Sequence, residues 1–126
     1  MNENEISKVV VGSAIEVHRE LGGAGLLEAV YEEAMAEKLT KRGLKVERRL
    51  SIPIIYKGKQ LGMPLRLDLK VNGLVLIDNK AVAEWNRIFE AQMLTYLRLT
   101  ELKLGLVISF GEQYVKNGIH RVVNGL

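Results

Sequence analysis

The sequence predicts a layered protein of helices and strands, of the α/β or α+β class, with the element order α-α-β-β-β-α-β-β. Two observations support this class: apolar residues recur with a helical period early in the chain, and this period then changes to the two-residue period of strands. The 126 residues are enough for one hydrophobic core and too few for two. We therefore expect one domain over residues 1–126.

Two helices are expected in the first third of the chain. Apolar residues recur every three or four positions from Glu3 to Leu21, as on one face of a helix. The glycines that follow are typical of a helix end. The same periodicity predicts a second helix from about Leu26 to Arg42, with Gly43 as its stop.

Strands are expected once the period changes to two. Val46 to Ile55 has this pattern, and Pro53 favours an edge position or a bulge. Within Leu61 to Val71, leucines alternate with charged residues, which indicates a half-buried strand. Asn72-Gly73 is a strong hairpin signal before the apolar strand Leu74 to Lys80.

The last third is expected to contain one helix and two strands. The helix covers about Arg87 to Thr100. The largely apolar segment Leu104 to Phe110 suits the middle of a sheet. A short strand, Ile119 to Val123, follows the turn signal Asn117-Gly118.

Composition excludes several classes of protein. Hydrophobic residues make up 48% of the chain and charged residues 26%, as in ordinary globular proteins. There is no cysteine, which excludes disulfides, thiolate metal sites and cysteine nucleophiles. Because there are only two histidines, a metal site would have to rely on carboxylates.

Targeting signals and charge are less decisive. No apolar run reaches the about 18 residues of a membrane span, and the first residues are polar and acidic. We therefore expect no membrane span, no signal peptide and a cytoplasmic location. The formal net charge of +3 permits a nucleic-acid partner without requiring one. The densest basic stretch, Lys41 to Arg49, is most simply a solvated helix end followed by an edge strand.

The residues that could carry chemistry lie between Asp68 and Lys80. An apolar strand ends in Asp78-Asn79-Lys80, and alternate strand residues share a face, so Asp78 and Lys80 should project together. Such charges at the end of a buried strand are costly unless they are paired or open to a cleft. If Asp68 on the preceding strand meets them, two carboxylates and a lysine form a site suited to Mg²⁺ or Mn²⁺.

A shared site sets a condition on the intervening hairpin. With a two-residue loop at Asn72-Gly73, Asp68 and Asp78 would face opposite sides of the sheet, because one step of register reverses every side chain. We therefore predict an odd-length loop, such as Val71-Asn72-Gly73, or a bulge.

Asp68 followed by Asp78-x-Lys80 resembles the signature of the PD-(D/E)xK nuclease superfamily, with Leu67 where some members have proline. On the following predicted helix, Gln92-x-x-x-Tyr96 is similar to the Gln-x3-Tyr motif of RecB-type nucleases. Its spacing puts both side chains on one helical face.

A third motif lies near the start of the second predicted helix. Gly25-x-x-Glu28-x-x-Tyr31 resembles the motif of the small bacterial GxxExxY proteins, which are grouped with the same superfamily. This resemblance extends over nearly the whole chain. Position 78 is Asp where those relatives more often have Glu, and the shorter arm would shift a metal by about 1.5 Å. Because enzymatic positioning is sensitive to such shifts, weak or absent activity is an alternative.

The resemblance implies a restriction-endonuclease-like core, a mixed central sheet flanked by helices, and hydrolysis of phosphodiester bonds in DNA or RNA. Asp68 and Asp78 would hold Mg²⁺ or Mn²⁺, with the backbone carbonyl of Asn79 as a further ligand. Lys80 would position the attacking water and stabilise charge on the phosphoryl oxygens. Glu28 would reach the same metal directly or through water. The substrate would contact Gln92, Tyr96 and Tyr31.

Two functions of different classes remain open. The first is a metal-dependent nuclease acting on nucleic acid, with a homodimer expected only by analogy. The alternative is a catalytically weak or inactive module that binds nucleic acid or a protein partner. An acid/base pair of Glu28 and Asp68 acting on a metabolite would leave the Asp-x-Lys and Gln-x3-Tyr spacings unexplained. Purely structural roles also remain open. They are a strand-end ion pair for Asp78 with Lys80, packing for Tyr31 and Trp85, a helix-surface pair for Gln92 with Tyr96, and a hydrogen-bonded helix histidine for His18.

Overall fold

The computed structural model describes residues 1–22, 25–82 and 84–126 of the chain. Its main sheet has five strands in the order β1-β4-β5-β6-β7. The elements along the chain are α1 (Glu3–Leu21), α2 (Glu28–Lys41), β1 (Val46–Ile52), β2 (Ile55–Tyr56), β3 (Lys59–Gln60), β4 (Leu65–Val71), β5 (Val75–Lys80), α3 (Ile88–Thr100), β6 (Leu104–Ser109), the 3-10 helix η1 (Val115–Gly118) and β7 (Ile119–Val123).

The sheet is mixed because of the connection through α3. β5 and β6 are parallel, while β1 with β4, β4 with β5, and β6 with β7 are antiparallel. A parallel pair needs a crossover between its strands, and α3 supplies it. This mixed α/β architecture is consistent with a restriction-endonuclease-like fold, as expected from the sequence.

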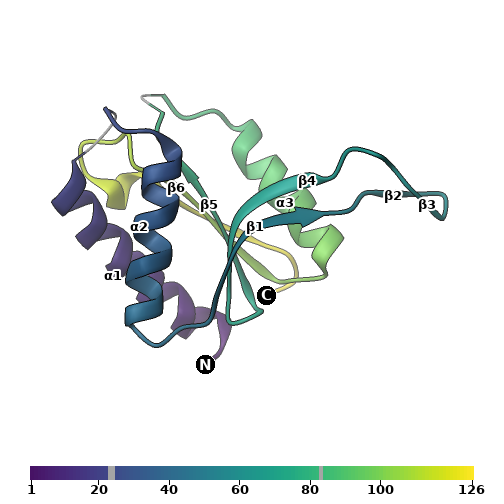
Figure 1. Ribbon diagram of the computed structural model, residues 1–126, viewed down its shortest axis with the longest axis horizontal. Helices are drawn as coiled ribbons and strands as arrows, with labels where there is room; N and C mark the ends of the chain where they lie inside the picture. Colours follow the sequence, from purple (N-terminus) through teal and green to yellow (C-terminus); the bar gives the residue numbers. More distant parts are fainter. Residues whose placement is uncertain (23–24, 83) are drawn as a thin grey trace.

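Helices cover both faces of the sheet (Figure 1). On one face, α1 and α2 pack against buried residues of β4, β5 and β6, in a core that includes Val10, Met35, Leu69, Ile77 and Leu106. On the other face, Met93, Tyr96 and Leu97 of α3 pack against Leu76 and Val107. Because β5 is covered on both faces, five of its six residues are buried. Among the described residues no helix is long and apolar enough to cross a membrane.

All the predicted elements are present, and several of them are shorter than predicted. The first helix and the last strand have the predicted ends. The strand predicted over Val46 to Ile55 ends at Ile52, and the one predicted from Leu61 begins at Leu65. Both errors have one cause, since Pro53 and Pro64 follow and precede these strands and a proline has no N–H for the ladder. β1 is an edge strand, as Pro53 indicated.

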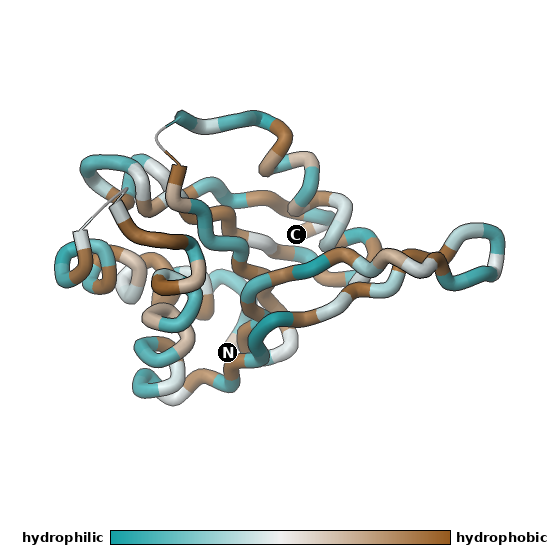
Figure 2. The backbone as a smooth tube through the Cα atoms, turned by 45° about the horizontal axis from the view of Figure 1, so that its top comes forward, coloured by the Kyte–Doolittle hydropathy of each residue, from teal (hydrophilic) through white to brown (hydrophobic). Residues whose placement is uncertain are grey.

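Between the two prolines the chain forms a projecting hairpin, whose separation from the main sheet was not predicted from the sequence. β2 and β3 pair through Ile55↔Gln60 and Tyr56↔Lys59 in a separate two-stranded sheet. Residues 53–64, which we call the arm, extend away from the helices and the main sheet (Figures 1 and 2). Figure 2 shows hydrophobic stretches along the arm and a hydrophilic tip.

The β4–β5 hairpin has the odd-length loop that a shared site requires. Val71 pairs with Val75, so three residues, Asn72, Gly73 and Leu74, lie between the paired positions. The predicted odd parity is confirmed, although the example given was shifted by one residue. Asn72 and Gly73 both have positive φ, which Asn-Gly accommodates readily. Continued by one step beyond Leu69↔Ile77, this register brings Asp68 opposite Asp78.

Candidate active site

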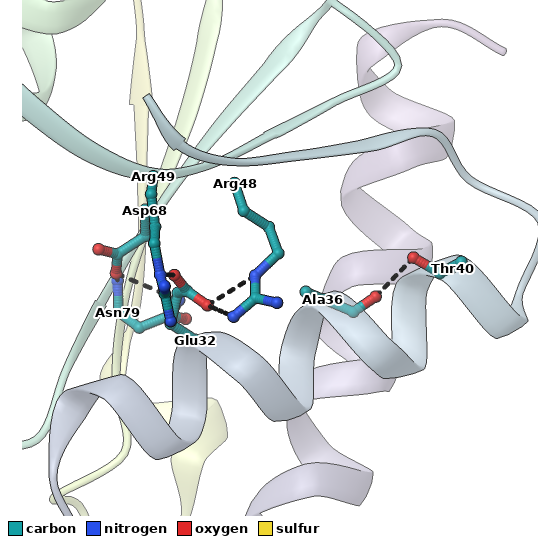
Figure 3. Close-up of polar contacts among 7 residues, drawn as sticks. All are labelled: Glu32, Ala36, Thr40, Arg48, Arg49, Asp68 and Asn79. Carbon is teal, nitrogen blue, oxygen red and sulfur yellow. Dashed lines mark hydrogen bonds and ion pairs between the residues drawn. The ribbon is translucent and has the colours of Figure 1, made fainter. Parts of the chain in front are cut away.

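Asp68 and Asp78 meet where β4 and β5 begin to separate. The last paired positions before the separation are Leu69 and Ile77. Beyond them, the Asp68 Oδ2 accepts a hydrogen bond of 2.8 Å from the backbone N–H of Asn79 (Figure 3). Asp68 and Asp78 are close enough for each carboxyl to affect the pKa of the other. The two acids of the signature are therefore neighbours.

Neither acid has its charge fully compensated. Burial raises the pKa of Asp68 to about 6, and the negative charges of Asp78 and Glu32 add to that rise, against the lowering by the hydrogen bond from Asn79. Burial also raises the pKa of Asp78, while Lys80 lowers it. In the described residues no cation forms an ion pair with Asp68. A bound cation would favour the ionised form of both groups.

Lys80 lies beside Asp78, as the strand period predicted. Its Nζ is 3.3 Å from the Asp78 Oδ2, and both side chains are largely buried. The same Nζ lies 4.7 Å from the ring centroid of Phe89, near the start of α3, so the ammonium is held between a carboxylate and an aromatic face. Phe89 was not identified from the sequence, because only the packing of α3 brings it to Lys80.

Asn79 points to the opposite side of β5 from its two charged neighbours. Its Nδ2 lies 3.3 Å from the Asp68 Oδ2, so Asn79 contacts that carboxylate through both its backbone and its side chain. Its Oδ1 is buried without a hydrogen-bond partner in the described residues. Such an orphan acceptor is uncommon in a folded interior.

The structure brings one of the two helix α3 motif residues to the acids. Tyr96 is buried, and burial together with the nearby charge of Asp78 raises the pKa of its hydroxyl. Gln92 lies one turn earlier on α3 and is exposed. Their roles as substrate contacts remain predictions.

Residues of the Gly-x-x-Glu-x-x-Tyr motif lie elsewhere. Glu28 is the exposed first residue of α2, and it forms no hydrogen bond or ion pair with another described residue. Tyr31 is fully buried, stacks on Phe110 at 4.3 Å between ring centroids, and donates a hydrogen bond to the Gly22 carbonyl. Packing accounts for Tyr31, and the metal role of Glu28 stays a prediction.

Glu32 is the acid that sequence reasoning missed. It is buried on α2 and raises the pKa of Asp68 through its charge. Its carboxylate pairs with two arginines of β1, Arg48 at 2.6 Å and Arg49 at 3.1 Å. Figure 3 shows these three side chains together. A signal was present in the sequence, because Glu32 lies on the same helical stripe as Met35 and Leu39, where a charge must find a partner.

The other singled-out residues have structural contacts. The His18 Nε2 lies 2.8 Å from the Glu112 carbonyl oxygen. Trp85 stacks on His120 at 3.5 Å between centroids, and its indole N–H donates to Glu90. His120, the partner in this aromatic pair, lies on β7 and is half-buried.

The donor set fits a hard divalent cation that keeps several waters. In residues 1–22, 25–82 and 84–126, no three side chains of the His, Cys, Asp and Glu types form a cluster able to hold a metal. Two adjacent carboxylates, both with raised pKa, are present. Mg²⁺ is commonly bound through one or two carboxylates, with waters completing the octahedron. Asp68 and Asp78 meet that requirement.

Comparison with known proteins gives one match. A family model described as the PD-(D/E)XK nuclease superfamily matches residues 4–122. No curated protein and no solved structure matches the chain. The matched range contains every residue of the candidate site.

Proposed function

Because the chain belongs to the PD-(D/E)XK nuclease superfamily, we propose that it is a nuclease dependent on Mg²⁺ or Mn²⁺ that hydrolyses phosphodiester bonds in DNA or RNA. Superfamily membership itself indicates nuclease-type phosphodiester hydrolysis on a nucleic-acid substrate. The metal ion, the roles of individual residues and the kind of nucleic acid are part of this proposal. The resemblance to GxxExxY proteins remains a prediction about the subgroup.

One observation carries the proposal: two neighbouring carboxylates, the half-buried Asp68 and the buried Asp78, lie together, and the ammonium of Lys80 lies beside Asp78. Like charges at short range oppose each other's ionisation, so this pair is poised to take up a cation. An ordinary strand-end ion pair accounts for Asp78 with Lys80, but it leaves the half-buried Asp68, which has no cation as a partner among the described residues, unexplained.

Each residue has a role in this mechanism. Asp68 and Asp78 would hold the ion, with the Asn79 carbonyl as a further ligand. When bound, such an ion polarises a phosphoryl oxygen and lowers the pKa of a coordinated water. Lys80 would orient the attacking water and stabilise negative charge on the phosphoryl oxygens. Phe89 limits the directions that the Lys80 ammonium can take.

The test is a cleavage assay on the purified protein. Labelled single-stranded, duplex and branched DNA, and RNA, are incubated with Mg²⁺, with Mn²⁺ and with EDTA. We expect metal-dependent cleavage that falls by about 100-fold or more in Lys80→Ala, because the charge-stabilising group is lost. Lys70→Ala is the matched control, since Lys70 lies on β4 in an ion pair with Glu47 and should leave the rate unchanged. Absence of cleavage of every substrate with either metal would refute the proposal.

A second candidate function rests on a different observation. Glu32, the third acid near the site, is paired with Arg48 and Arg49, and the remaining donors are only two carboxylates. This arrangement favours a catalytically weak or inactive module that keeps the fold and binds nucleic acid or a protein partner. Retention of a labelled substrate without cleavage in the same assay would support it.

A further inference from the structure

The segment between Glu47 and Asp68 carries an excess of positive charge. Between Glu47 and Asp68 the chain has five basic residues and no acid, so the remainder carries a net charge of −2 against +3 for the whole chain. Two of the five, Arg48 and Arg49, are paired with Glu32. The other three form no ion pair with a described residue, and they are Lys57, Lys59 and Arg66.

The outer part of the arm is exposed on all sides. Residues 55–64 are exposed without exception. They include large apolar side chains, such as Tyr56 at 54% and Met63 at 79% of full exposure. The tip is the turn Lys57-Gly58, both residues having positive φ, with the Lys57 ammonium 5.4 Å from the Tyr56 ring centroid. A ribbon with a cationic tip and apolar sides therefore stands free of the body.

Two interruptions separate the arm from the main sheet. The last rung of β1 with β4 is Ile52↔Leu65, and the first rung of the arm is Ile55↔Gln60. Between them lie two residues on one strand and four on the other, including Pro53, Gly62 and Pro64. A two-stranded hairpin of this size has little stability of its own. The arm therefore gains little stability from the rest of this chain, and a contact with another molecule would stabilise it.

We propose that the arm binds in a groove of duplex DNA. The inference rests on the proposed function and specifies its substrate. A two-stranded ribbon fits the major groove of B-form DNA, whereas the major groove of duplex RNA is too narrow and deep for it. Unpaired lysines at the tip complement the phosphate backbone. Arm and site are continuous, because β4 begins next to the arm and reaches Asp68 after three further residues.

The experiment measures binding with cleavage prevented. Fluorescence anisotropy of a labelled DNA duplex is recorded in EDTA over a range of salt concentrations. We expect the double variant Lys57→Glu/Lys59→Glu to weaken duplex binding by about tenfold or more and to lower the salt slope by about two, because each phosphate contact contributes about one unit. Lys8→Glu/Lys116→Glu is the matched control, because both lysines are exposed on elements away from the arm and the charge change is the same.

Wild-type protein should also bind duplex DNA more tightly than single-stranded DNA or duplex RNA. Equal weakening in the two double variants would overturn the inference, because net charge alone would then explain binding. Tighter binding of a single strand would also overturn it. So would a homodimer in sedimentation that Tyr56→Ser/Met63→Ser dissociates, since the arm would then contact a second copy. Duplex binding through the arm without cleavage in the metal assay would refute the proposed function and leave this inference standing.

Discussion

At the scale of residues, Asp68 determines how the site responds to pH. Its pKa of about 6 follows mainly from burial, and the backbone and side-chain donors of Asn79 oppose this rise. Without metal, the folded protein therefore resists ionisation of Asp68, while the unfolded chain ionises it near the ordinary value of 3.8.

This difference predicts how metal-free stability depends on pH. In EDTA, the contribution of Asp68 makes the free energy of unfolding fall as pH rises from about 4 to about 6, because the unfolded chain loses its proton first. Asp68→Asn should flatten that fall, whereas Glu33→Gln, on an exposed part of α2, should not. Urea unfolding at several pH values measures this effect. An unchanged slope in Asp68→Asn would show that the carboxyl is not held in this way.

Residue identities were easier to predict than residue environments. Asp68, Asp78 and Lys80 follow from strand period and spacing, and the structure places them together. The partners of Glu32 could not be assigned from spacing, because Arg48 and Arg49 come from a strand beyond the helix. Burial of a charge depends on contacts between distant segments, which local sequence does not specify.

At the scale of elements, the segment after Lys80 is held against the end of β6. The Phe110 N–H donates to the Lys80 carbonyl, and the Ser109 hydroxyl to the Val82 carbonyl at 3.3 Å. Gly111 comes so close that a Cβ on it would lie 1.9 Å from the Val82 oxygen. This close approach fixes the direction in which the chain leaves the site.

We therefore predict that Gly111→Ala lowers the free energy of unfolding by about 1–3 kcal/mol, because the methyl group forces the backbone of Val82 away. Gly12→Ala in α1 is the control and should raise it by about 0.5–1 kcal/mol, since its nearest neighbour is the flexible Arg42 side chain at 3.3 Å. Urea unfolding of both variants measures the difference. Equal stabilities for the two variants would mean that the backbone at Val82 can move away from Gly111 without a cost in free energy.

The order of the main elements and the parity of the β4–β5 loop were predicted, and the ends of β1 and β4 beside the arm were not. Loop parity could be inferred because a shared site requires either an odd-length loop or a bulge, and the structure has the odd-length loop. β1 ends at Ile52 and β4 begins at Leu65 because two prolines face each other across one hairpin. That they face each other can be known only once the pairing register of the two strands is known. The arm is missed for the same reason, since its residues are strand-like and only their lack of covering elements distinguishes them.

At the scale of the whole molecule, the acids of the candidate site and the basic segment that precedes β4 lie in different parts of the fold. The mixed sheet and its helices hold Asp68 in the middle of β4 and Asp78 near the end of β5, while five basic residues and no acid lie between Glu47 and Asp68. A polyanionic substrate bound along that segment would be guided toward Asp68. Metal binding by the two acids is the claim on which the rest of the account depends.

The most direct measurement of that claim is Mn²⁺ binding by calorimetry to the wild type, Asp68→Asn and Asp78→Asn. If both aspartates bind the same ion, either substitution alone should lower the Mn²⁺ affinity by about tenfold or more. Glu33→Asn is a control at an exposed acid and should bind as the wild type does. Mn²⁺ binding that survives in either aspartate variant, or a wild type that binds no Mn²⁺, would contradict a shared metal site.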